Sequence, residues 1–140
     1  MENVNKKSIV WVGAFLENEN HEYLFLRRGK NSSWGVGGWQ LPGGKLEWGE
    51  EPIGGLNREI SEETGSKAAD ALKLIGLETA LVETRGNEYH VVQIIYHGKY
   101  SGSKVEIGED HDHFKWMTLK EALTETLIAN LDKFIKREMV

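Results

Sequence analysis

The sequence contains no cysteine, which excludes disulfide bridges, thiolate metal sites and a cysteine nucleophile. No apolar run approaches the roughly 18–20 residues that a membrane-spanning helix needs, so we expect no transmembrane segment. Lys6 and Lys7 precede a short apolar stretch, but no small-residue cleavage site follows, and the stretch alternates like a strand. We therefore expect no signal peptide. These absences favour a cytoplasmic protein.

The charge balance is mildly acidic, and it limits the kinds of partner. Lys and Arg total 17 against 22 Asp and Glu in 140 residues, a net charge of −5. Such a balance disfavours a general nucleic-acid partner, and with no transmembrane segment we expect no membrane partner. An anionic substrate would need local cations or a bound metal ion. With 39% hydrophobic and 28% charged residues, the length predicts one folded domain over residues 1–140.

Hydrophobic periodicity predicts a mixed α/β (α+β) domain. A helix is expected over residues 52–64, because Pro52 suits its first turn and Gly65 its end. A second helical region is expected over 119–140, with Leu127, Leu131 and Phe134 at helical spacing. Strands are expected over residues 8–16, 23–28, 72–82, 89–100 and 114–117, with 39–41 extended; the first two would form a hairpin.

Three carboxylates of the first helix share one sector of its surface. At about 100° per residue, Glu59, Glu62 and Glu63 lie beside the apolar stripe that Leu56 and Ile60 belong to. Like charges four residues apart destabilise a helix, and a divalent cation would remove the repulsion. Mg²⁺ prefers carboxylate and water oxygens and commonly acts together with substrate phosphates. The alternative interpretation is a solvated acidic face.

The spacing of residues around these carboxylates resembles the Nudix box. That motif reads G-x5-E-x7-R-E-U-x-E-E-x-G-U, with U a bulky aliphatic residue. Its fixed positions are filled by Gly44, Glu50, Arg58, Glu59, Glu62, Glu63 and Gly65. Ile60 fills the first aliphatic position, and Ser66 departs from the pattern at the last. The preceding segment Trp-Gln-Leu-Pro-Gly-Gly-Lys-Leu-Glu, residues 39–47, is similar to that of MutT-like nucleoside triphosphate pyrophosphohydrolases.

This resemblance implies a fold, a cofactor and roles for the motif residues. The Nudix fold is a mixed β-sheet sandwiched between α-helices. Mg²⁺ or Mn²⁺ would be the cofactor. The implied catalytic residues and metal ligands are Glu59, Glu62 and Glu63, joined by the Gly43 carbonyl and Glu47 as further ligands, while Gly44, Glu50, Arg58 and Gly65 would be structural. Which carboxylate acts as the general base stays open.

The implied activity is hydrolysis of a diphosphate bond in a nucleotide. The lead-in segment favours a nucleoside triphosphate, giving a monophosphate and pyrophosphate. The alternatives are ADP-ribose or a nucleotide sugar as substrate, or a catalytically silent module that binds a nucleotide. Because many relatives dimerise, a homodimer is left open.

Residues outside the motif supply further candidates for the site. Arg27 and Arg28, with Lys30 nearby, could bind phosphate, but neighbouring strand residues point to opposite faces, so we expect only one of the two to reach a substrate. Trp34, Trp39 and Tyr89 could stack on a base, although aromatic residues more often lie in the core, where we expect Trp39.

The loop Gly-Glu-Asp-His-Asp-His, residues 108–113, is a further candidate. The Nudix resemblance implies that Glu109, Asp110 or Asp112 could provide an additional acidic ligand or base, although a solvated loop is the simpler interpretation of each. His111 and His113 lack a further zinc ligand at suitable spacing, so we expect no zinc site.

Overall fold

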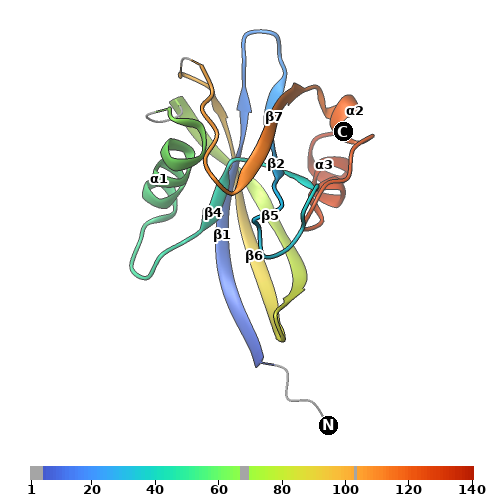
Figure 1. Cartoon of the computed structure of the whole chain (residues 1–140). Helices are drawn as coiled ribbons and strands as arrows, with labels where there is room; N and C mark the ends of the chain where they lie inside the picture. Colours follow the sequence, from blue (N-terminus) through green and yellow to red (C-terminus); the bar gives the residue numbers. More distant parts are fainter. Residues whose placement is uncertain (1–4, 67–69, 103) are drawn as a thin grey trace.

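The structure is a computed structural model that describes residues 5–66, 70–102 and 104–140. Its strands and helices appear along the chain in Figure 1. The strands are β1 (Asn5–Glu17), β2 (Tyr23–Arg28), β3 (Trp39–Gln40), β4 (Gly43–Lys45), β5 (Asp70–Thr84), β6 (Asn87–Lys99) and β7 (His111–Met117). The helices are α1 (Pro52–Thr64), α2 (Leu119–Ala122) and α3 (Leu131–Glu138). None of the described helices is long and apolar enough to cross a membrane.

The strands form one mixed sheet in the order β3-β2-β1-β6-β5. β1 and β6 run parallel along their whole lengths, and the other pairs are antiparallel. One edge of β1 is shared by two partners. Next to the turn, Glu17 pairs with Tyr23 of β2, as the expected hairpin requires. Further back, Trp11 to Gly13 pair with β4, a strand that the sequence did not predict.

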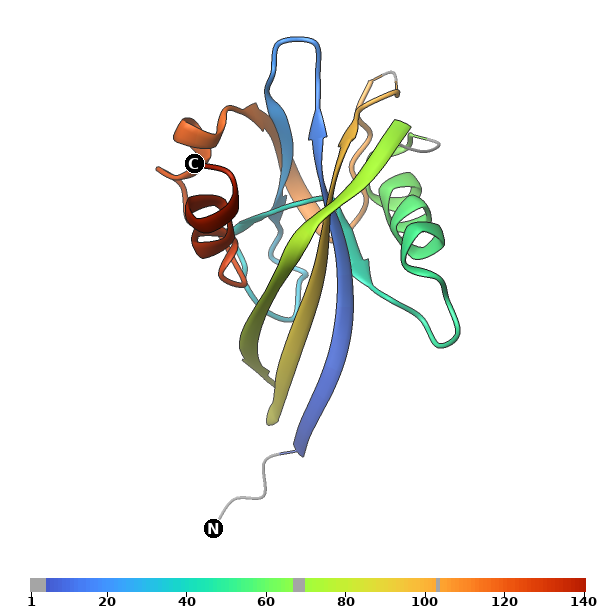
Figure 2. The same ribbon diagram turned by 180° about the vertical axis from the view of Figure 1, so that it is seen from behind.

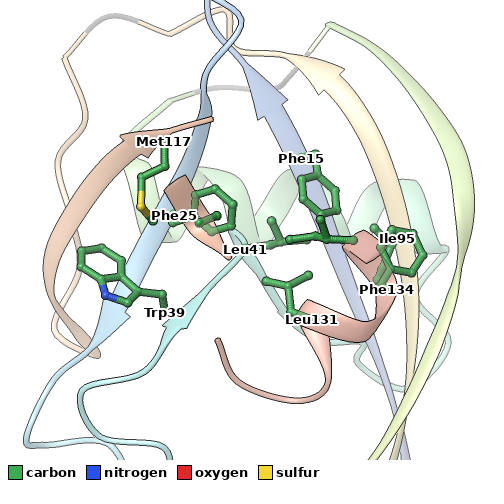
Figure 3. Close-up of a cluster of buried hydrophobic side chains, with 10 residues drawn as sticks. Phe15, Phe25, Trp39, Leu41, Ile95, Met117, Leu131 and Phe134 are labelled. Atoms are coloured by element: carbon green, nitrogen blue, oxygen red, sulfur yellow. The ribbon is translucent and has the colours of Figure 1, made fainter. Parts of the chain in front are cut away.

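Helices cover the two faces of the sheet, which confirms the predicted Nudix-type α+β architecture. Helix α1 packs on one face, while α2 and α3 lie on the other (Figures 1 and 2). The α1 side buries a cluster that includes Val12, Leu56 and Ile60. The α3 side buries Phe15 and Phe134 with other side chains that converge from the sheet and the helix (Figure 3). Burial of these apolar surfaces is the main force that holds the layers together.

The prediction of one helical region over residues 119–140 was wrong. Only α2 and α3 are helical, and residues 123–130 between them form an irregular segment. Leu127 pairs with Trp39 in an isolated bridge, flanked by hydrogen bonds between Trp39 and residues 126 and 128. Ala129 and Asn130 both adopt positive φ, which an α-helix cannot accommodate. The helical spacing of Leu127 therefore reflects burial from a loop.

Two adjacent glycines in α1 have different surroundings, and they provide a matched test. A Cβ at Gly54 would meet nothing within 4 Å, whereas one at Gly55 would lie 2.6 Å from Leu46 Cδ1 and 2.8 Å from Glu50 Oε1. Gly54→Ala should therefore stabilise the protein by about 0.5–1 kcal/mol through helix propensity. Gly55→Ala should lose this gain to overpacking, which typically costs about 1–3 kcal/mol. Urea unfolding measures both, and equal stabilisation by the two variants would contradict the packing argument.

Candidate active site

Helix α1 is fixed by its buried stripe, and this sets the direction of its carboxylates. Leu56 and Ile60 are fully buried against the sheet, so Glu59 and Glu63 lie at the margin of the buried surface. The helix ends where Gly65 adopts a left-handed conformation, with φ of 76°, and donates its N–H to the Ser61 carbonyl. Ser66, the departure from the Nudix pattern, is buried, and its hydroxyl donates a 2.7 Å hydrogen bond to Tyr100 Oη.

Arg58 is surrounded by the carboxylates of the motif. Its Nε and Nη2 donate to the two oxygens of Glu50 at 2.7 and 3.0 Å, a bidentate pair. Its Nη1 lies 3.0 Å from Glu59 Oε1, 3.3 Å from Glu62 Oε2 and 3.7 Å from Glu47 Oε1. The hydrogen bonds from Arg58 and from the Glu47 backbone lower the pKa of Glu50 to about 2. Arg58 thus ties the loop before α1 to the helix.

Glu59 and Glu63 lie against the glycine strand β4. Glu63 Oε1 accepts a 2.6 Å hydrogen bond from the Gly43 N–H. A Cβ on Gly44 would lie 2.6 Å from the carboxyl carbon of Glu59, so only glycine permits this approach. Burial raises the pKa of Glu63 well above its ordinary value, while the Gly43 N–H opposes the shift. Burial also raises the pKa of Glu59, against the opposing charge of Arg58.

The donor set suits a hard divalent cation, but the side chains do not surround one point. Within residues 5–66, 70–102 and 104–140, no group of three His, Asp or Glu side chains is disposed to hold a metal ion. Arg58 draws Glu59 and Glu62 toward itself, and Gly43 holds Glu63. Glu62 and Glu47 are well exposed, with side chains 60% and 68% accessible. Carboxylate oxygens match the preference of Mg²⁺, and release of the contacts to Arg58 Nη1 would free two of them.

The two arginines of β2 lie in different surroundings. Arg28 is half-buried; its Nε donates to the Trp34 carbonyl at 2.8 Å and its Nη1 to Gln40 Oε1 at 2.9 Å. Its guanidinium stacks 4.5 Å from the centre of the Trp34 ring, and its charge acts on Glu63. Arg27 instead pairs with Asp112 at 2.8 Å. Of the two arginines, Arg28 is the one whose charge acts on Glu63.

An aromatic pocket lies beyond Arg28 on the α3 side of the sheet. It encloses about 250 Å³ and is bordered by the rings of Trp11, Trp34 and Tyr89. Trp11 and Trp34 contact each other with ring centres 5.3 Å apart. Lys45 of β4 also lines the pocket, so it adjoins the glycine strand that carries the carboxylate contacts. Trp39, the other aromatic residue before the motif, is buried in the core.

The loop before β7 and the first residue of that strand bring further polar groups to Glu63. The Asp110 carbonyl accepts hydrogen bonds from the Gly29 N–H and the Ser32 hydroxyl, which fixes the loop beside the end of β2. The charge of Asp110 acts on both Glu63 and Arg28. The side chain of His111 is 1% exposed, with Nδ1 3.7 Å from Glu63 Oε2. Burial, with a smaller contribution from Arg28, lowers the pKa of His111 to about 4.

Sequence reasoning missed Trp11, Gln40 and the contact of His111 with Glu63. Trp11 lies in β1, where the alternating pattern of residues predicted a strand. That pattern does not show which face of the strand borders a pocket. Gln40 stands directly before Leu41 and Pro42 in the lead-in segment, so its place in the motif was a usable signal. For His111 no signal existed, since its contact depends on how β7 pairs with β2.

The acidic helix α1 packs against the glycine strand β4 of a mixed sheet, and comparison with known proteins identifies the family. Residues 7–137 match the NUDIX domain. The chain therefore belongs to the Nudix family.

The relatives agree with this assignment. A MutT-like protein of Streptomyces ambofaciens is 33% identical over 113 residues, which cover 80% of this chain and 65% of the relative. An RNA pyrophosphohydrolase of Bartonella bacilliformis is 32% identical over 69 residues, 49% of this chain and 35% of that protein. The chain thus spans about two thirds or less of the length of these curated relatives.

Solved structures show the same fold over nearly the whole chain. The MutT protein of Methanosarcina mazei Go1 superimposes with a TM-score of 0.79 at 32% identity, covering 96% of this chain and 95% of that one. The NUDIX domain of Shewanella oneidensis NrtR, solved in complex with ADP ribose, gives a TM-score of 0.73 at 20% identity, covering 93% and 85%. At that identity the second likeness concerns the fold alone.

Proposed function

We propose that this protein is a cytoplasmic, divalent-metal-dependent pyrophosphohydrolase that converts a nucleoside triphosphate to a monophosphate and pyrophosphate. One observation carries the proposal. Glu59 and Glu63 lie against β4, and the charge of Arg28, which stacks on Trp34 of the aromatic pocket, acts on Glu63. The acidic groups, the cation and the aromatic pocket therefore lie in the order that a substrate needs: the acidic groups for the metal ion, the cation for the polyphosphate, and the pocket for the base.

Glu59, Glu62 and Glu63 are the residues that would hold Mg²⁺ or Mn²⁺, with Glu47 and the Gly43 carbonyl as further ligands. A bound divalent ion supplies charge neutralisation for the diphosphate and lowers the pKa of a water molecule. On metal binding, Nη1 of Arg58 would release Glu59 and Glu62, while the hydrogen bonds from Nε and Nη2 to Glu50 would keep the loop attached to the helix. One carboxylate of this set, or Asp110, would orient or deprotonate the attacking water.

Arg28 and the aromatic pocket would bind the rest of the substrate. The guanidinium of Arg28 presents charge to a phosphate while its contacts with Trp34 and Gln40 fix its direction. A nucleobase would lie against Trp34, Trp11 or Tyr89, because base–aromatic stacking contributes about 1–3 kcal/mol per base. Arg27, held by Asp112, would contribute less.

A panel of nucleotides tests the activity and the substrate class together. Nucleoside triphosphates, ADP-ribose, a nucleotide sugar, a dinucleoside tetraphosphate and 5′-triphosphorylated RNA are incubated with Mg²⁺, and released phosphate and pyrophosphate are measured. We expect the highest kcat/KM for a triphosphate, with pyrophosphate as product. A preference of tenfold or more for another substrate, about 1.4 kcal/mol of discrimination, would overturn the triphosphate assignment alone. Binding without any hydrolysis would instead indicate a silent nucleotide-binding module.

Variants of the two arginines extend this test. Arg28→Gln keeps a hydrogen-bond donor near the Trp34 carbonyl but removes the charge, and should raise KM for a triphosphate about tenfold or more. Arg27→Gln is the matched control on the same strand and should change KM less than threefold or so. Equal effects of the two variants would contradict the role of Arg28.

A further inference from the structure

Among the residues that the structure describes, two buried side-chain polar atoms lack a hydrogen-bond partner: Asn57 Oδ1 and His111 Nε2. The second belongs to the ring that approaches Glu63. Leaving a buried polar atom unpaired costs about 1–3 kcal/mol. An apolar side chain of similar size would avoid this cost, so packing alone does not explain a histidine at this position.

A local irregularity between β7 and β2 directs His111 inward. Arg27 pairs with His113, and the next residue, Arg28, pairs with His111, so Asp112 is an extra residue in β7. Such a bulge changes the direction of the neighbouring side chains. Asp112 meets Arg27 at 2.8 Å, while His111 is buried beside Glu63.

The two oxygens of Glu63 face groups from different parts of the fold. Oε1 accepts the Gly43 N–H at 2.6 Å, and Oε2 lies 3.7 Å from His111 Nδ1. That second distance exceeds a direct hydrogen bond, and a small rotation of the ring would close it. No other side-chain contact of His111 competes for Nδ1 among the described residues. Glu63 is thus the carboxylate that the imidazole Nδ1 approaches, while the charges of Arg28, Asp110 and Asp112 act on the ring from further away.

We propose that His111 is a positioning residue that directs its Nδ1 toward Glu63 Oε2 and, with the Gly43 N–H, holds this carboxylate in the orientation needed to bind a divalent ion. The inference rests on the proposed role of Glu63 as a ligand. Groups that orient a ligating carboxylate typically contribute about 10–100-fold to metal affinity or activity.

The experiment compares three variants by Mn²⁺ binding to metal-free protein, followed by electron paramagnetic resonance, with kcat, KM and Tm measured alongside. His111→Leu should bind Mn²⁺ about 10–100-fold more weakly and lose kcat to a similar extent, with KM nearly unchanged. Its Tm should equal or exceed that of the wild type, because the unpaired nitrogen is removed. His111→Asn places an amide N–H where Nδ1 lies and should retain affinity within about threefold. His113→Leu, exposed two residues away, is the control.

Several outcomes would overturn the positioning role. If His111→Leu binds Mn²⁺ as tightly as the wild type, the role is refuted. It is also refuted if His111→Asn, with an unchanged Tm, binds Mn²⁺ as weakly as His111→Leu. If His111→Leu fails to fold, the His111→Asn comparison still decides, since a loss of affinity at the wild-type Tm contradicts rescue by the donor. If the wild-type protein binds Mn²⁺ but hydrolyses no nucleotide, the proposed function is refuted. The Mn²⁺ affinities of the His111 variants then still test the positioning role. Wild-type protein that binds no Mn²⁺ would overturn both.

Discussion

Replacing Glu63 by glutamine should lower kcat by about 10²–10⁴-fold and at the same time raise the melting temperature of the metal-free protein. The loss of activity follows because Gln keeps the size of the side chain but cannot supply the charge of a ligand or base. The gain in stability follows from burial, which raises the pKa of Glu63 well above its ordinary value. A rise of about 2–5 °C, measured by calorimetry at pH 7–8, is expected.

The pH dependence gives this stability effect a definite sign. Below about pH 4, Glu63 is protonated in both the folded and unfolded states, so the variant gains nothing. As the pH rises through the ordinary carboxyl range, the unfolded chain loses this proton more readily than the folded chain, in which burial raises the pKa of Glu63, and wild-type stability falls. Glu62→Gln, at an exposed position, should lower kcat without this stabilisation, and Glu51→Gln is the neutral control. Near wild-type kcat in both Glu63→Gln and Glu62→Gln would refute their assignment as ligands.

Removal of divalent metal should abolish hydrolysis, to below about 1% of the initial rate, since the carboxylate cluster would otherwise repel a polyphosphate. Protein treated with EDTA and dialysed should recover activity with Mg²⁺ or Mn²⁺, but not with NaCl of equal ionic strength. Full activity of metal-free protein in excess EDTA would sink the proposal.

Addition of metal to the metal-free protein can also be followed without measuring activity. A cation that binds only the folded state stabilises it by RT ln(1 + [L]/Kd), so Tm should rise with metal concentration. The Glu59→Gln variant should show a smaller rise, because it removes a ligand that lies against Gly44. An identical rise in this variant would exclude Glu59 from the metal site.

Much of the site could be predicted because it is local in sequence. Helix α1 begins and ends at the residues expected from Pro52 and Gly65, since both signals act within one turn. The Arg58 contacts to Glu50 and Glu62 span eight and four residues. Short-range geometry of this kind is encoded in residue spacing, and so the motif indicated its own arrangement.

Contacts between distant segments could not be predicted in the same way. Which partners Arg27 and Arg28 meet depends on the strands that flank β2, and the pairing with β7 and β3 brings Arg27 to Asp112 and Arg28 to Gln40. The segment 123–130 retained a helical spacing at Leu127, yet its pairing with Trp39 took precedence over that pattern. Tertiary hydrogen bonds and burial outweigh weak local propensity.

The sequence by itself determined the acidic helix and the hairpin strands, because propensity, periodicity and fixed spacing act along the chain. The tertiary structure alone decided three further features. These are the burial that shifts Glu63, the aromatic pocket beside Arg28, and the bulge that turns His111 toward the carboxylate. Each depends on desolvation or strand register between residues far apart in sequence, which residue spacing does not encode.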